Sequence, residues 1–456
     1  MASPLGSTVA RLVRGLQEEV RTAGRRLFDR HLRLAVTGLR RSGKTVFTTA
    51  LAYHLRDGRG LPFFRPVHEG RYLGALSLDP PGPPFPLDRA LGALRASPPS
   101  WPEPTRSLST LRLELRATAT GPAASLQPIR RLLLDIVDYP GEWLLDLVLL
   151  DRDFAAFSEL ALALAHDPKR VAFARDLLAL LAETDGGEDV LVADRVASAF
   201  RDYLRQLQRE DFALVLPGRM IEEEAPSRSP PFAPLPPRLA ETPLWHRMAE
   251  RYAAYRERVL QPFFAQWFAR FDRQIVLVDL LAALGRGPAH FADTREALAL
   301  ALAAFRYGKN GRLRRLLAPR IERVLFAMSK ADHVAPNQHA NARELLRLLV
   351  ADAARAPRLE GVRHEVMVLA ALRSTDVLHI EHQGQLLSCV RGRLAEDDRE
   401  TVLFPGEVPH ELPQEREWTQ RRFRFRRFAP RRLSDAGPDT HIRLDRALDW
   451  LIGDRL

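Results

Sequence analysis

A glycine-bounded loop in this sequence carries the residue types that bind phosphate. It reads Gly38-Leu-Arg-Arg-Ser-Gly-Lys44-Thr45 and matches in full the pattern GxxxxGK followed by Ser or Thr. The glycines let backbone N–H groups turn toward an anion, Lys44 can reach the terminal phosphates and assist catalysis, and the Thr45 hydroxyl suits Mg²⁺. We expect nucleotide contacts from this stretch at Gly38, Arg41, Ser42, Gly43, Lys44, Thr45 and Val46.

The lysine of this loop is informative because lysine is scarce in the chain. Of the 68 basic residues, four are lysines: Lys44, Lys169, Lys309 and Lys330. A lysine kept in such a sequence indicates a place where a compact ammonium is needed and a planar guanidinium does not fit. Two of the four fall inside nucleotide-site motifs.

A carboxylate and a glycine follow the next strongly apolar run. The segment Asp138-Tyr-Pro-Gly141 is a DxxG pattern at the end of that run. Asp138 can hold Mg²⁺, commonly through water, and the Gly141 N–H can contact a γ-phosphate. Glu142 stands where many GTPases have a glutamine that positions the attacking water, and its negative charge predicts slow hydrolysis. Asp279 is a competing metal carboxylate, which we interpret as structural.

A base-recognition motif follows another strand-like run. Ser329-Lys330-Ala331-Asp332 resembles the NKxD or TKxD motif of GTPases, with serine at the first position. An aspartate there accepts hydrogen bonds from the guanine N1–H and exocyclic amine, which adenine does not present, while the lysine stem lies along the base. We expect further contacts from His333 and from a backbone loop at Ala371 and Leu372. An ATPase with a purely structural Asp332 is the alternative.

The segment Trp101-Pro-Glu-Pro-Thr105-Arg106 lies between the phosphate loop and DxxG, where a switch segment is expected. We predict that Thr105 joins Thr45 and Asp138 as a metal ligand. Arg106 is the candidate internal arginine finger, which makes it a catalytic candidate beside Lys44 and Glu142. Trp101 and both of these residues are predicted to contact nucleotide. An ordinary loop with a buried tryptophan is the alternative.

These motifs require a sheet that brings strand ends together. Apolar runs alternate with helical patterns, which is typical of a mostly parallel α/β sheet. The strand, loop, helix order around the first motif is that of a P-loop NTPase, and the two runs around the Gly121-Pro122 turn suggest a hairpin feeding the sheet. The strands are predicted over residues 32–37, 108–115, 131–137, 274–279, 323–328 and 365–370, and the helix over 45–56.

The remaining segments define the expected domain organisation. Residues 61–104 are rich in proline and predict irregular surface structure, and residues 225–237 predict a proline-rich linker. Residues 423–428 alternate Phe and Arg, which favours a strand with one buried face over a nucleic-acid stacking surface. The last helix is predicted over 442–451. We predict an amphipathic helix over 1–30, a GTPase-type domain in two parts over 31–143 and 271–456, and a helical insertion over 144–270.

Composition sets the class of protein and its surroundings. The chain has 456 residues, 46% hydrophobic and 27% charged, as in ordinary globular proteins. The net charge is +11, but 57 acidic residues are interspersed with the basic ones, so nucleic-acid binding is not favoured. A single cysteine, Cys389, and the lack of a secretory signal predict a cytoplasmic protein. The basic N-terminal helix leaves a peripheral membrane partner at the inner membrane open, and no oligomeric state is predicted.

Several longer strings resemble the YcjX-like family of bacterial P-loop proteins. They are LAVTGLRRSGKT, WPEPTR, IVDYPGEWLLDL, VLVDLLAALGRGP, SKAD and IRLDRALDWL, and the resemblance covers almost the whole chain. It implies a GTPase-type core interrupted by a helical insertion between DxxG and KxD, binding of GTP and GDP, and a cytoplasmic protein linked to envelope stress through the phage-shock regulon. With the motifs, it predicts a Mg²⁺-dependent GTPase that acts as a slow switch. A nucleotide-stabilised membrane-associated scaffold is a further alternative.

Overall fold

The computed structural model describes residues 30–104, 107–125, 128–222, 229–304, 321–354, 362–420, 423–433 and 440–456. The helix predicted over 1–30 therefore lies outside the described residues, apart from Arg30, which begins the first strand. Among the helices described, none is both long and apolar enough to cross a membrane.

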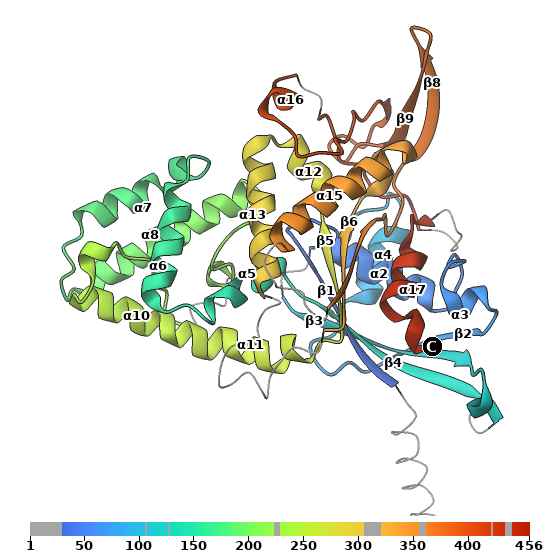
Figure 1. The fold of residues 1–456 in the computed structure, drawn as a ribbon, viewed down its shortest axis with the longest axis horizontal. Coiled ribbons are helices and arrows are strands. Elements are labelled where there is room, and N and C mark those ends of the chain that lie inside the picture. The colour runs from blue at the N-terminus through green and yellow to red at the C-terminus, as the bar shows by residue number, and fades with distance from the viewer. Residues whose placement is uncertain are drawn as a thin grey trace, which may run out of the picture.

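A seven-stranded sheet forms the centre of the molecule, in the order β2-β3-β4-β1-β5-β6-β7 (Figure 1). Strands β4, β1, β5, β6 and β7 run parallel to one another, while β3 is antiparallel to β4 and β2 to β3. This confirms the mostly parallel α/β sheet and the predicted hairpin. The strands are β1 (Arg30–Gly38), β2 (Tyr72–Leu78), β3 (Ser109–Thr118), β4 (Ile129–Asp138), β5 (Arg273–Val278), β6 (Arg323–Met328) and β7 (Arg363–Val368).

The sheet separates two hydrophobic cores because successive side chains of a strand point to opposite faces. In β1, Leu34 and Val36 point into one core and Ala35 into the other, and all three are fully buried. The first core is closed by α2 (Lys44–Leu55) and by the last helix, α17 (Leu444–Ile452), which confirms both predicted helices. The second core is closed by α12 (Leu280–Gly285), α13 (Pro288–Ala304) and α15 (His339–Ala354) and continues into the insertion.

The irregular structure predicted for the proline-rich residues 61–104 is wrong in part. This stretch holds α3 (Arg65–His68), strand β2 and α4 (Leu87–Arg95). The strand pairs with β3 at the edge of the sheet, and Leu73, Leu76 and Leu78 are largely exposed. Because the strand does not bury one alternating apolar face, its sequence lacks the period-2 pattern that identifies most strands.

The chain between β4 and β5 is helical, as predicted, and stands to one side of the sheet in Figure 1. Helix α10 (Pro243–Tyr255) continues through a π-helical turn, Arg256–Leu260, into α11 (Gln261–Gln266). In the described part of the expected linker over 225–237, Phe232, Ala233 and Leu235 are fully buried among the helices, so this irregular connection packs into the core of the insertion. The helices are α5 (Gly141–Asp146), α6 (Phe154–His166), α7 (Val171–Glu183), α8 (Val190–Arg209), α10 (Pro243–Tyr255) and α11 (Gln261–Gln266).

The part of the chain after β7 departs from prediction. A small antiparallel sheet contains β8 (Asp376–His382), β9 (Gln385–Arg393) and β10 (Glu400–Leu403), and α16 (Glu415–Thr419) follows it. The strand predicted over 423–428 is wrong: its inward Phe423 and Phe428 are buried and its arginines exposed, but the described backbone pairs only through the bridge Leu394↔Phe428. Alternating burial arises here from an extended segment laid on the core, without strand pairing.

Candidate nucleotide-binding site

The phosphate-loop motif joins the central strand β1 to α2. Arg41 and Gly43 have φ angles of 58° and 90°, and Gly43 is the N-cap of α2. A glycine offers no side chain to cap the helix, so the first N–H groups of α2 are available to an anion. The Ser42 N–H donates to the Leu39 carbonyl at 3.2 Å, which closes the loop. The loop therefore has the geometry of an anion cradle at the amino end of a twelve-residue helix.

Lys44 is held inside this loop. Its side chain is buried, and Nζ donates to the Gly38 carbonyl at 3.1 Å and to the Leu39 carbonyl at 3.5 Å. Burial lowers the pKa of the Lys44 ammonium, and the nearby carboxylates of Glu142 and Asp138 offset part of that effect. The DxxG carboxylate and Glu142 thus share one electrostatic environment with the loop lysine.

The DxxG motif meets the phosphate loop directly. Asp138 ends β4 opposite Val36 of β1 and is buried. A Cβ built on Gly141 would overlap the carbonyl oxygen of Gly38, so only glycine allows this approach. Thr45 and Asp138 offer an alcohol and a carboxylate oxygen, which are the hard ligands that Mg²⁺ prefers while it keeps several waters. These two residues fit a Mg²⁺ ion that is completed by phosphates and water.

The SKAD motif is braced against the neighbouring strands. Ser329 N–H donates to the Val278 carbonyl at 3.0 Å, and Lys330 forms an ion pair with Asp279. Asp279 also caps α12 by accepting from Ala282 N–H at 3.1 Å. Although burial raises the pKa of Asp279, Lys330 holds it below the ordinary value. Asp279 therefore occupies the structural position that we expected, and Lys330 is anchored beside it.

Asp332 is tied to the loop that follows β7. Its Oδ2 accepts from Ser374 N–H at 2.7 Å and from Ser374 Oγ at 2.8 Å, and its carbonyl accepts from the Thr375 hydroxyl. His333 contacts the same Ser374 Oγ at 3.2 Å, and burial lowers the pKa of its imidazole. Asp332 and the loop holding Ala371 and Leu372 are thus brought together.

Sequence reasoning missed Ser374 and Thr375, which lie only two to four residues beyond the loop positions that it named. Their signal was a pair of hydroxyl residues in the loop that follows β7, in Arg-Ser-Thr. It also missed Arg40, whose Nε lies 3.8 Å from Glu142 Oε1. The spacing of the phosphate-loop motif says nothing about the middle positions, so Arg40 carried no signal.

Of the predicted switch residues, the structure describes Trp101 but not the other two. Thr105 and Arg106 lie outside the described residues. Trp101 is half-buried, and its Nε1–H donates to the Phe428 carbonyl at 2.9 Å. The Phe428 ring packs against His333 with 5.0 Å between ring centroids, so Trp101 is linked to the SKAD end of the site. Of the other predicted contacts, Ser42 is fully buried, Val46 is half-buried against the core, and Arg41 forms an ion pair with Asp211.

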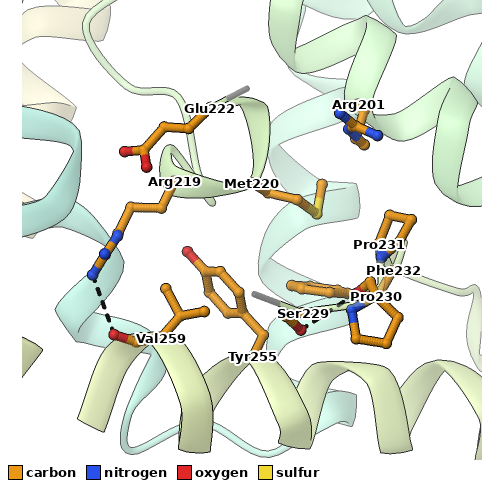
Figure 2. Close-up of a pocket in the computed structure, with 10 residues that line it drawn as sticks. All are labelled: Arg201, Arg219, Met220, Glu222, Ser229, Pro230, Pro231, Phe232, Tyr255 and Val259. Carbon is orange, nitrogen blue, oxygen red and sulfur yellow. Dashed lines mark hydrogen bonds between the residues drawn. The ribbon is translucent and has the colours of Figure 1, made fainter. Parts of the chain in front are cut away.

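A small cavity lies within the helical insertion (Figure 2). Met220, Phe232 and Tyr255 form part of its wall, and Arg219 crosses it to donate to the Val259 carbonyl at 3.2 Å. The same Arg219 guanidinium lies 3.8 Å from the centroid of the Trp143 ring, next to Glu142 in the sequence. The insertion therefore contacts the helix that follows DxxG.

The strand order and the motif positions define the class of this protein. The phosphate loop follows β1, DxxG follows β4 and the SKAD motif follows β6, so all three lie at the carboxyl edge of one parallel sheet. This is the fold of a P-loop NTPase of the GTPase type, with a helical insertion.

Comparison with known proteins agrees with that class. Residues 32–456 match the model of the YcjX-like family, DUF463. The chain belongs to this family. It is 36% identical over 465 aligned positions to a protein of Escherichia coli (strain K12) named Ras-like GTPase YcjX, covering 97% of this chain and 99% of that protein. It is 35% identical over 467 positions to a protein of the same name from Shewanella oneidensis, covering 94% and 96%.

Proposed function

We propose that this protein binds GTP with Mg²⁺ at the phosphate loop, hydrolyses it slowly and acts as a nucleotide-dependent conformational switch. The observation that carries the proposal is the contact between the two phosphate motifs, where Gly141 packs on the Gly38 carbonyl beside the buried Lys44. The relatives named Ras-like GTPase support the same class of reaction.

The residues around the phosphates divide into binding and orienting groups. The first N–H groups of α2 and the Lys44 ammonium bind the phosphates, while Thr45 and Asp138 hold the metal. When bound, Mg²⁺ neutralises negative charge on the phosphate oxygens. Thr105 and Arg106 keep their predicted roles as the third metal ligand and the arginine finger. Glu142 orients the attacking water, and hydrolysis is slow because a carboxylate near the γ-phosphate is unfavourable except as far as its charge is screened.

Base selection is assigned to Asp332. Guanine presents N1–H and an amine as donors, whereas adenine presents an unprotonated N1 at the same edge, so a carboxylate there favours guanine. The Ser374 bonds hold the Asp332 carboxylate in place, which reduces the rotamer freedom lost on binding. Lys330, His333, Ala371, Leu372 and Trp101 complete the proposed pocket.

Calorimetric titration of the protein with GDP and with ADP, each with Mg²⁺, tests this assignment. We expect tight GDP binding and negligible ADP binding. The reverse result would remove the role given to Asp332 and make the protein an ATPase.

The output of the switch is a change of conformation that a partner recognises on the helical insertion over residues 144–270. This insertion separates the two parts of the GTPase domain, over 31–143 and 271–456. We place this switch in the cytoplasm, in the envelope-stress response that the family resemblance implies, with a peripheral membrane partner at the inner membrane. Vesicle flotation with GDP or a non-hydrolysable GTP analogue tests the membrane part. Equal absence from the floated fraction in both nucleotide states would refute it.

A further inference from the structure

Glu142 is enclosed by groups that the helical insertion supplies or holds. Its side chain is only 13% exposed, and Arg40 Nε lies 3.8 Å from Oε1 on one side. On the other side, Gly218 packs against the stem of the side chain, since a Cβ built on Gly218 would overlap Glu142 Cβ and lie 3.1 Å from Cγ. The carboxylate therefore has little freedom to choose its own direction.

The direction of Arg40 is set by the carboxyl end of α8, although Arg40 belongs to the phosphate loop. Its Nη1 donates to the Gln208 carbonyl and lies 3.8 Å from Asp211 Oδ1. Asp211 also pairs with Arg41 and, at 2.7 Å, with Arg286. With φ at 60°, Asp211 adopts the left-handed conformation that aspartate tolerates better than most residues. The insertion thus ends α8 with a carboxylate that orients the loop arginines.

The glycine at 218 is explained by Glu142 and not by its own backbone. Gly218 has φ −72° and ψ −36°, a conformation open to any residue. Its N–H donates to Asp146 Oδ1 at 2.7 Å, and Arg219 N–H donates to Oδ2 at 3.0 Å. The Tyr255 hydroxyl donates to the same Oδ2 at 2.6 Å.

Asp146 belongs to α5, the same short helix as Glu142 and Trp143. The Trp143 indole N–H donates to Glu222, so the insertion segment that begins at Gly218 is fastened to α5 at both of its ends. Figure 2 shows Arg219, Glu222 and Tyr255 from this contact. Helix α5 and this segment are thereby held as one unit.

We propose that Arg40 and Gly218 are positioning residues for Glu142, so that the helical insertion sets how well the site hydrolyses GTP. This rests on the proposed GTPase function. The guanidinium also solves an electrostatic problem, because a carboxylate close to a γ-phosphate is unfavourable unless a nearby cation offsets its charge. Glu142 can thus orient water where an unscreened glutamate would repel the substrate.

A double-mutant cycle with Arg40→Gln and Glu142→Gln tests the first half. Arg40→Gln is expected to lower kcat about tenfold while KM for GTP and the Kd for GDP stay within about twofold, because the pair acts through orientation. In the Glu142→Gln background the same change should alter kcat less than about twofold. Arg40→Lys should restore part of the activity. An equal loss in both backgrounds would show that Arg40 acts on the phosphate or on stability, and would overturn the inference.

Gly218→Ala tests the second half, with Gly92→Ala as the matched control. A Cβ at Gly92, in α4, would meet nothing within 4 Å, whereas at Gly218 it must displace Glu142. We expect Gly218→Ala to lower kcat about 10- to 100-fold with GDP affinity retained, and Gly92→Ala to leave kcat unchanged. Unchanged kcat in both variants would overturn the inference.

The two proposals fail in different ways. If the unmodified protein neither binds GDP nor hydrolyses GTP, the proposed function fails and takes this role with it. If the unmodified protein binds and hydrolyses but the Arg40 and Glu142 effects are additive, the positioning role alone is wrong.

Discussion

Replacing Asp332 by asparagine is expected to weaken GDP binding without loss of the fold. Within the described part of the chain, Oδ2 of Asp332 receives both bonds from Ser374, which leaves Oδ1 to accept from the guanine N1–H and amine. Asparagine has one acceptor oxygen, so it can satisfy Ser374 N–H or the base but not both. With its oxygen toward Ser374, its NH₂ group faces the guanine donors.

The size of the effect follows from the bonds at stake. A hydrogen bond to a charged group contributes about 1.5–3 kcal/mol, and about 1.4 kcal/mol corresponds to a tenfold change in Kd. Loss of one such bond weakens GDP binding by roughly 10- to 150-fold, so Asp332→Asn, which affects two, should weaken it by at least that much. Phosphate contacts are untouched, so xanthosine diphosphate, which has a carbonyl in place of the guanine amine, should bind the variant better than it binds the unmodified protein.

Calorimetry with GDP, ADP and xanthosine diphosphate, each with Mg²⁺, measures these changes. Ser374→Ala is the matched control: it removes one of the Ser374 bonds but keeps the carboxylate, and should cost less than about tenfold in GDP affinity. Unchanged GDP affinity in a folded Asp332→Asn variant would refute the base-recognition assignment.

Three further expectations come from the phosphate loop and the core. Lys44→Ala should weaken GDP binding by at least about 100-fold in calorimetry, because the loop loses its ammonium. Lys169→Ala, which removes a lysine that pairs with Asp167 within the insertion, should not weaken it. Similar affinities for both variants would contradict the role of Lys44. Burial raises the pKa of Asp135, but hydrogen bonds from Arg112 and His31 outweigh it and lower the pKa from an ordinary 3.8 to about 2. The ionised carboxylate therefore contributes about 2 kcal/mol to the free energy of unfolding above pH 3.8, and this contribution should be lost as pH falls through 2. Urea unfolding measures this loss, and Asp135→Asn should remove it; an unchanged pH profile in that variant would exclude the contribution. Phe232→Ala should lower the free energy of unfolding by about 3–5 kcal/mol, since Phe232 is fully buried against Phe157. A change below about 1 kcal/mol would mean that this segment lies on the surface and does not pack into the insertion.

Local sequence patterns were sufficient for the central strands of the sheet. The strands β1, β4, β5 and β6 are largely buried on both faces and read as apolar runs. The edge strand β7 is exposed at its start and was found from the apolar residues of its second half. The edge strand β2 and the outer strands β8 and β10 of the small sheet escaped because their side chains are mostly exposed or half-buried and lack a periodic apolar face. The Phe and Arg run at 423–428 is the opposite case: it has a strand-like pattern of buried and exposed residues but does not pair as a strand.

In the candidate site, too, local patterns predicted some residues and missed others. Gly38, Lys44, Thr45, Asp138, Gly141 and Asp332 were found from spacing, because each belongs to a motif that spans a few residues at a strand end. The structure brings their elements to one edge of the sheet, while their contacts to nucleotide stay predictions.

The sequence by itself therefore determined the class of this protein and the residues that its motifs name, because a phosphate loop or a strand end is a local feature. Only the tertiary structure decided what surrounds them: Ser374 beside Asp332, and Arg40 and Gly218 on either side of Glu142. Gly218 lies 76 positions beyond Glu142 in the chain. No short-range spacing records a contact of that kind, because it exists only once the insertion has folded back onto the helix after DxxG.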